Sequence, residues 1–196
     1  MLSLKTNMQN TIDFSKIRKV AESATAEIYI GFPSGRKHVE TKHKNKDGKY
    51  KDIDGKDPQY ANLETADLAR MLHFGAAGIP ARPFLEDGVL SKKKEIKVAM
   101  AKEVKKVVEG GTPNWDKVGT MAVGAVQELV RSDYYKSRVP NSPKTVKYKG
   151  SDQPLIDGAD LINSLSYVVE SNDKIGTMKG TMDSDTYQQT DFRSSK

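Results

Sequence analysis

Two helical stretches, separated by the break Gly110-Gly111-Thr112-Pro113, constrain the fold of this chain more than any other feature. Before the break, apolar residues recur every three or four positions at Ile96, Met100, Val104, Val107 and Val108. After it, Asn114 is a candidate N-cap, and a second apolar row follows at Trp115, Val118, Ala122, Ala125 and Leu129. Rows with this spacing give each helix one apolar face. We therefore predict a long helical hairpin over residues 79–135.

Short strands are expected before and after that hairpin. Residues 26–32 alternate apolar with small or polar side chains and end at Pro33-Ser34-Gly35, which is typical of a strand. Residues 166–170 predict a second strand, and residues 174–178 its hairpin partner. A further short strand is expected at 145–148. The pattern predicts an α+β fold in which a small, mainly antiparallel sheet, built from 26–32, 166–170 and 174–178, packs on the helical hairpin.

Polar composition separates the ends of the chain from its middle. Of the 196 residues, 36% are hydrophobic and 30% are charged, so long polar loops or tails are expected. We predict an N-terminal arm at 1–13, a single α+β domain at 14–179 with a protruding loop at 33–60, and a C-terminal tail at 180–196. Ordering each residue costs roughly 1–2 kcal/mol. Segments with little to bury are therefore expected to gain order only by docking on a partner.

Several classes of protein are excluded by what the sequence lacks. It contains no cysteine, so disulfides and thiolate chemistry are excluded. No apolar run approaches the roughly 20 residues that span a bilayer, and no apolar signal segment opens the chain. We expect a soluble protein made in a cytoplasm, with no membrane partner.

Candidate metal and catalytic residues are sparse. His38, His43 and His73 have no ligand spacing in common. Carboxylates between Asp47 and Asp57 resemble a calcium loop, but the closing Glu is missing and lysines are interleaved. No phosphate-binding glycine loop or nucleophile motif is present. We therefore predict no metal site, no cofactor and no enzymatic activity.

The charge of the chain permits contact with a polyanion. Its formal net charge is +6, which favours DNA through a screened, sequence-independent attraction. The candidate DNA-facing residues are Lys92, Lys93, Lys94 and Lys97. Solvated lysines that pair with Glu95, Glu103 and Glu109 explain the same pattern, and both interpretations stay open.

Two segments far apart in the chain resemble one known family. They are Leu68-Ala-Arg-Met-Leu-His-Phe-Gly-Ala-Ala-Gly-Ile-Pro-Ala-Arg-Pro-Phe84 and Pro154-Leu-Ile-Asp-Gly-Ala-Asp-Leu-Ile-Asn-Ser-Leu-Ser-Tyr-Val168. Together they resemble the paired hallmarks of the tail-completion, or neck, proteins of tailed bacteriophages, which are Mu-like virion-morphogenesis proteins. The resemblance covers residues 68–90 and 147–169. His73 stands where the family has an acid, and Gly158-Ala159 stands where it has Thr-Gly.

The resemblance implies a structural virion protein of the head–tail junction, present in the host cytoplasm during assembly. It implies a homo-oligomeric ring of six or twelve copies that joins the portal-side connector to the tail tube or terminator proteins and lets DNA pass. Contact with the genome would be transient and non-specific. The candidate subunit-interface residues are Arg82, Phe84, Pro154 and Leu155. Arg82, held between two prolines, is either a rigid donor to a neighbouring segment or part of a purely structural helix entry.

A second class of function competes with this one. The basic residues also fit a nucleic-acid-associated accessory protein that is not part of a particle. A salt-sensitive, DNA-binding monomer would support that alternative. A small hydrolase is a third and weaker hypothesis.

Overall fold

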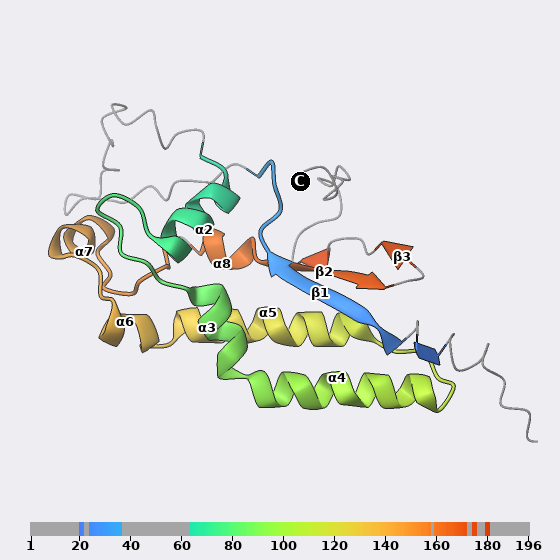
Figure 1. Cartoon of the computed structure of the whole chain (residues 1–196). Coiled ribbons are helices and arrows are strands. Elements are labelled where there is room, and N and C mark those ends of the chain that lie inside the picture. Colours follow the sequence, from blue (N-terminus) through green and yellow to red (C-terminus); the bar gives the residue numbers. More distant parts are fainter. Residues whose placement is uncertain are drawn as a thin grey trace, which may run out of the picture.

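The computed structural model describes residues 20–21, 24–36, 63–157, 159–171, 174–175 and 179–180 (Figure 1). The predicted arm at 1–13, most of the predicted loop at 33–60 and nearly all of the predicted tail lie outside these residues. The helices are α2 (Thr65–Phe74), α3 (Phe84–Ser91), α4 (Lys93–Val108), α5 (Trp115–Arg131), α6 (Tyr134–Arg138), α7 (Pro143–Lys149) and α8 (Asp160–Asn163). The strands are β1 (Ala26–Gly31), β2 (Ser166–Ser171), β3 (Lys174–Ile175) and β4 (Lys179–Gly180).

Helices and strands are mixed, so the prediction of an α+β fold is confirmed. β1 and β2 pair antiparallel over their full length, from Ala26 opposite Ser171 to Gly31 opposite Ser166. The short strands β3 and β4 both pair antiparallel with β2, near its opposite ends. The first two predicted strands therefore form as expected. Residues 176–178 of the third lie outside the described residues.

Helix α5 lies at the centre of the fold and contacts α3, α4, β1 and β2. All five residues of its predicted apolar row are buried, and the Asn114 side chain caps the helix by accepting a hydrogen bond from the Lys117 amide. Two glycines permit close packing on it. A Cβ on Gly88 would lie 2.5 Å from the Val126 Cα, and one on Gly119 would lie 2.3 Å from the Tyr167 ring. Both α3 and β2 therefore approach the α5 backbone directly.

The segment predicted as one hairpin over 79–135 is divided among four helices, α3 to α6. Helix α3 begins only at Phe84, because the backbone of Pro83 is not helical, at φ −73° and ψ 59°, and the Arg82 amide donates to the Leu72 carbonyl of α2. A turn at Lys92 separates α3 from α4, which then runs beside α5 (Figure 1). Extended backbone at Ser132 ends α5 before α6. The prediction of a single long helix before the glycine break is thus wrong.

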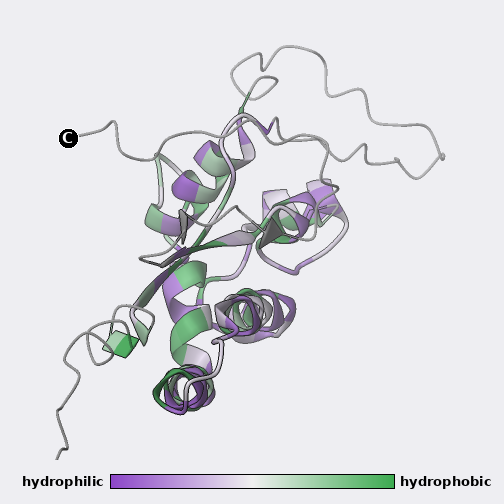
Figure 2. Cartoon of the chain, turned by 90° about the vertical axis from the view of Figure 1, so that its right-hand side faces the viewer, coloured by the Kyte–Doolittle hydropathy of each residue, from purple (hydrophilic) through white to green (hydrophobic). Residues whose placement is uncertain are grey.

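The predicted apolar face of α4 is also wrong in part. Ile96 and Val107 are buried as expected, but Met100, Val104 and Val108 are exposed. The buried positions between the first two are taken by Ala99 and Glu103 instead. Small Ala99 lets α4 approach α5 closely, and the Glu103 carboxylate is buried because it finds polar partners there. Figure 2 views α4 and α5 nearly along their axes, with α4 lowest and the sheet above them.

Residues 145–148, predicted as a short strand, belong to helix α7. The Ser142 side chain accepts a hydrogen bond from the Thr145 amide, and Pro143 occupies the first turn, where its missing N–H costs nothing. Gly150, at φ 71°, ends the helix in the left-handed conformation that glycine adopts without strain. These local signals explain why the segment is helical and why the strand expected there is wrong.

Candidate assembly surfaces

The two segments that carry the family resemblance fold around one hydrophobic core. Phe84 from the first segment and Leu155, Leu161 and Leu165 from the second lie in the same buried cluster. Residues of α5, among them Val126 and Val130, complete that cluster. The two segments, although far apart in the sequence, therefore form one structural unit together with α5.

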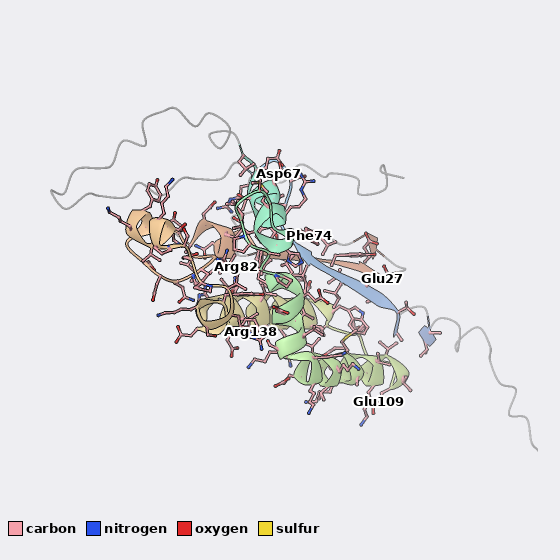
Figure 3. All side chains as sticks on the ribbon, turned by 60° about the vertical axis from the view of Figure 1, so that its left-hand side comes forward. Glu27, Asp67, Phe74, Arg82, Glu109 and Arg138 are labelled. Carbon is pink, nitrogen blue, oxygen red and sulfur yellow. The ribbon has the colours of Figure 1, made fainter. Side chains whose placement is uncertain are left out.

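Arg82 holds the connection between α6 and α7. Only 4% of the surface of Arg82, which is labelled in Figure 3, is exposed. Its guanidinium donates from Nε to the Val139 carbonyl at 3.0 Å and from Nη2 to the Pro140 carbonyl at 3.1 Å. Burial lowers the pKa of the guanidinium, which still remains charged at any physiological pH. The expected donor fork is thus present, and it holds carbonyls of its own chain.

The four candidate subunit-interface residues all lie inside the fold of one chain. Arg82, Phe84 and Leu155 are buried, and Pro154 is among the most fully buried side chains. Phe84 packs edge-to-face on Phe32, with ring centroids 6.1 Å apart. The structure brings the four into one region, but their side chains make contacts within the chain. An interface with another copy would have to be built from other residues.

Left-handed backbone shapes the segment around the second resemblance. Leu155 has φ 61° and Ala159 has φ 63°, values that side-chain-bearing residues adopt only with strain. Ala159 occupies the position where the family has glycine, which adopts this conformation freely. The segment is held by Gln153, whose Nε2 donates to the Val130 and Ser132 carbonyls at 3.1 and 2.7 Å. This anchors its start to the C-terminal end of α5.

Tyr135 and Asp87 form a polar contact that no sequence pattern predicts. The Tyr135 hydroxyl donates to Asp87 Oδ2 at 2.6 Å, joining α6 to α3. Burial, followed by this hydrogen bond to a carboxylate, raises the pKa of the Tyr135 hydroxyl. The hydroxyl therefore stays protonated and acts as a donor. Neither residue stands in a recognisable motif, because they meet only in three dimensions.

The candidate DNA-facing lysines differ in their partners. Lys92 Nζ lies 3.0 Å from Glu128 Oε1 of α5, and this partner raises the pKa of Lys92. Lys93, Lys94 and Lys97 are exposed and form no ion pair with any residue in the described ranges. Glu103 and Glu109 do pair with lysines, namely Lys106 at 2.7 Å and Lys105 at 3.6 Å, but neither lysine is one of the four candidates.

Glu103 joins α4 to the start of α5. It is 3% exposed, and its Oε2 accepts hydrogen bonds from the Asn114 amide at 2.8 Å and from Lys106 Nζ at 2.7 Å. These two partners, Lys106 first, lower the pKa of the Glu103 carboxyl. The sequence predicted Glu103 only as a partner of nearby solvated lysines. Its actual role is to bridge the two helices across the turn.

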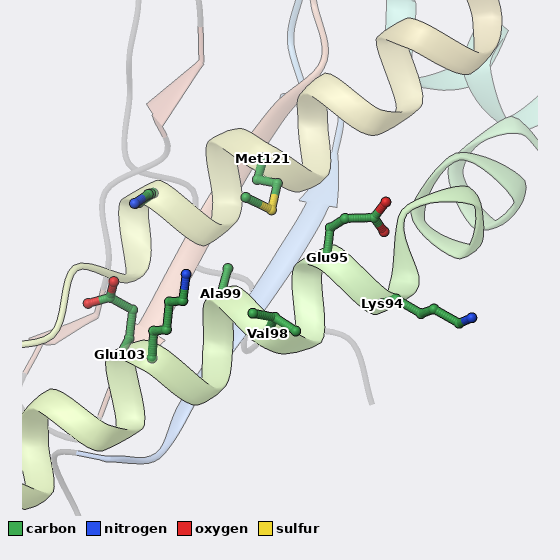
Figure 4. Close-up of a pocket in the computed structure, with 8 residues that line it drawn as sticks. Lys94, Glu95, Val98, Ala99, Glu103 and Met121 are labelled. Atoms are coloured by element: carbon green, nitrogen blue, oxygen red, sulfur yellow. The ribbon is translucent and has the colours of Figure 1, made fainter.

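A hollow of about 490 Å³ lies between α4 and α5 (Figure 4). Its lining mixes charges with apolar groups and consists of Lys94, Glu95, Val98, Ala99, Lys102, Glu103, Lys117 and Met121. Its buried carboxylate, Glu103, is already engaged by Lys106 and Asn114. The remaining charged groups are solvent-facing lysines and Glu95. The hollow thus offers a positively charged rim on the outside of the helix pair.

Among the three histidines only His73 lies within the described residues. Its ring packs edge-to-face on Phe74 and Phe84, with centroids 4.6 and 5.5 Å away. Burial lowers the pKa of His73, and the nearby Glu86 and Asp87 oppose that shift. Within the described part of the chain, no three His, Asp or Glu side chains gather where they could hold a metal ion. His38 and His43 lie outside it.

Large apolar side chains are exposed at several places. Phe74 is 73% exposed at the end of α2, and Val108 is 67% exposed at the end of α4. Val98, Tyr29 and Leu90 are each about half exposed. Periodicity in the sequence suggested a buried position for Val108, so this exposure was not expected. Single exposed apolar side chains are common on protein surfaces, and only a contiguous group of them marks a contact surface.

No protein-family model matches this chain, and neither a search of curated proteins nor a search of solved structures finds a match. Across the described residues, no helix combines the length and the apolar content needed to cross a membrane. The resemblance of the two segments to tail-completion proteins therefore rests on the residues of these segments alone.

Proposed function

We propose that this protein is a structural component of the head–tail junction of a tailed bacteriophage. In this proposal it forms a ring of six or twelve copies between the portal-side connector and the tail, joins the two and lets DNA pass. One observation carries the proposal: the two segments that resemble tail-completion proteins share a single core with α5.

The finer architecture belongs to the same proposal. The sheet would pack on a helical hairpin made of α4 and α5, joined by the turn at 109–114. A second buried cluster supports this, because Ile96 and Ala99 of α4 meet Trp115 and Val118 of α5, with Ile28 of β1 packed against them. The Glu103 bridge to Asn114 fixes the turn between the two helices.

The protein would work by binding and holding, without chemical turnover. Its buried polar contacts, such as Arg82 with the 139–140 carbonyls, stabilise the domain that displays the outer surfaces. The exposed residues of α4 are the part of that domain best suited to contact other molecules, because their apolar side chains can form the core of an interface and the lysines its polar rim. Buried area at such contacts offsets the entropy of ordering polar segments.

A second candidate function rests on the lysines alone. Lys93, Lys94 and Lys97 lack ion-pair partners in the described ranges, so they are available to a polyanion. In the ring they would face passing DNA for a short time. In the alternative they would bind nucleic acid directly, without a particle.

The decisive experiment locates the chain in purified virions. Mass spectrometry of particles should detect it at a fixed copy number, and electron microscopy should place it as a ring at the head–tail junction. Deleting its gene should leave filled heads and free tails, and supplying the wild-type gene in trans should restore joined particles. Normal particles from the deletion strain, or absence of the chain from virions, would rule the proposal out.

A salt titration separates the two candidates. A monomer that binds DNA with a steep loss of affinity at rising salt, and that is missing from particles, supports the accessory protein. A ring in particles with weak DNA affinity supports the junction protein.

A further inference from the structure

Two exposed surfaces of this chain match each other in charge and in apolar content. The first is a row on α4 with members three or four residues apart, which places them along one side of the helix. All of them are exposed. We name this the α4 outer row, and it consists of Lys93, Lys97, Met100, Val104 and Val108. Lysines occupy its first part and apolar side chains the rest.

The second surface is the outer face of the sheet. Side chains alternate along a strand, and Ile28 and Ile30 of β1 pack into the core, so Glu27 and Tyr29 point away from it. Opposite them on β2 lie Glu170 and Val168. We name these four residues, Glu27, Tyr29, Val168 and Glu170, the outer sheet face. Tyr29 is 52% exposed, and both glutamates are exposed.

The charges on these surfaces lack ion-pair partners within the described residues. Lys93 and Lys97 form no ion pair there, whereas Lys92, Lys105 and Lys106 each do. Glu27 and Glu170 stand directly across from each other in the β1–β2 register, and like charges in that position destabilise a sheet. Glu27 accepts a hydrogen bond from the Tyr29 hydroxyl, but no lysine or arginine among the described residues reaches either carboxylate.

We propose that the α4 outer row of one copy docks on the outer sheet face of the next copy, with Lys97 between Glu27 and Glu170. The spacing fits. From Lys97, Met100 and Val104 lie about 4.5 and about 10.5 Å along the helix, while Tyr29 lies about 7 Å along the strand from Glu27. With Lys97 on the acidic pair, Tyr29 would lie between Met100 and Val104.

This contact deepens the proposed function and rests on it, since the second copy is the ring neighbour. The two surfaces differ, so the contact is heterologous and can repeat from copy to copy until a ring closes. A nucleic acid is a poorer occupant of the row, because Met100, Val104 and Val108 offer nothing to phosphates. In this contact Lys93 and Lys97 would therefore no longer face DNA in the ring, and Lys94 and Lys102, which line the hollow between α4 and α5, are left for a polyanion.

Because the chain has no cysteine, single introduced thiols give an unambiguous test. Purified Tyr29→Cys and Val104→Cys proteins are mixed and oxidised, and mixed disulfide dimers are counted. As a matched control, Phe74→Cys replaces Tyr29→Cys, because Phe74 is an aromatic residue on another surface and is at least as exposed. We expect the yield of mixed dimers with Tyr29→Cys to exceed the control by roughly tenfold, the contrast between a held contact and random collision.

Charge reversal tests the acidic pair separately. Lys97→Glu should weaken self-association about tenfold, because it sets a third negative charge against two carboxylates. Adding Glu27→Lys and Glu170→Lys to that variant should recover association to within about threefold of wild type. Reversal of Lys94, which lies outside the contact, should leave association unchanged.

The outcomes separate this contact from the ring itself. If native mass measurement finds a ring but positions 29 and 104 do not cross-link, the proposed contact is wrong and the proposed function still stands. A monomer with no cross-link counts against both. If Val104→Cys alone forms disulfide dimers, without a Tyr29→Cys partner, the α4 helices of two copies pack against each other. That result would overturn the proposed contact. If Lys97→Glu weakens DNA binding but not self-association, the α4 outer row binds nucleic acid. That result would also overturn the proposed contact.

Discussion

Helices α4 and α5 are nearly equal in length and both carry regularly spaced apolar residues, but they use those residues differently. The whole apolar row of α5 is buried, because α3, α4 and both long strands surround it. On α4 the buried positions include an alanine and a glutamate, while Met100, Val104 and Val108 remain outside. Periodicity therefore reports that a helix has an apolar side. Whether that side faces its own chain or another one depends on what packs around it.

Truncating one valine on each helix gives the sharpest test of that difference. Val118 of α5 is 1% exposed and Val104 of α4 is 37% exposed. Val118→Ala should lower the free energy of unfolding by about 2–3 kcal/mol, since two buried methyl groups are lost and a cavity remains. Val104→Ala should change it by less than about 0.5 kcal/mol. Urea unfolding of the two variants measures both values. Equal losses would mean that α4 is as deeply packed as α5.

Two cationic residues extend the comparison to polar groups. Arg82 is buried on two carbonyls, whereas Arg70 is exposed and pairs with Asp67 at 3.0 Å. Arg82→Lys should cost about 2 kcal/mol, because a single ammonium cannot reach both carbonyls and leaves one buried acceptor unpaired. Arg70→Lys should be nearly neutral, as exposed ion pairs contribute little. Chemical denaturation again measures both. A neutral Arg82→Lys would show that the 139–140 segment is not held by this side chain.

The sequence predicts most reliably where local chemistry decides the structure. The Asn114 cap, the α5 row and the two strands β1 and β2 form as the residues indicate. Apart from the strand expected at 145–148, where local capping signals favour helix α7, the errors fall where distant parts of the chain decide. Helix α3 starts at Phe84 because the Arg82 amide is bound by α2, and no local pattern shows that contact.

The candidate site follows the same division. The sequence singled out Arg82 as a donor and the exposed lysines as a surface, and the structure shows both features. It did not reveal that Glu103 bridges α4 and α5 or that Asp87 binds Tyr135. Those contacts join residues on different helices. Spacing within one helix cannot disclose them.

A smaller effect is expected where the backbone is strained. Ala159, at φ 63°, adopts a left-handed conformation just before α8. Ala159→Gly should therefore stabilise the fold by about 1 kcal/mol. Ala101→Gly, on the exposed side of α4, should destabilise it by a similar amount, because glycine is a poor helix former. Opposite shifts in the melting temperatures of the two variants would establish that the local backbone conformation decides whether an Ala→Gly substitution stabilises or destabilises the fold. Destabilisation by both substitutions would argue against strain at Ala159.

The smallest effect at neutral pH, and the most informative about the α4–α5 turn, concerns Glu103. Glutamine in its place can still accept the Asn114 amide, so Glu103→Gln should change stability little at about pH 7. The pKa of Glu103 is lowered below its ordinary 4.5 by Lys106 and Asn114, so the unfolded chain binds the proton more readily. The stabilisation from the carboxylate is then fully present above pH 4.5 and is lost as the pH falls through the folded pKa.

Unfolding measured from about pH 7 to about pH 3 should show that the free energy of unfolding declines less steeply with acid for Glu103→Gln than for wild type. As a control, Glu95→Gln removes an exposed carboxylate from the same helix. This variant should lose stability with falling pH as steeply as wild type does. Identical declines in all three proteins would mean that the bridge from Glu103 to Asn114 does not hold the two helices together.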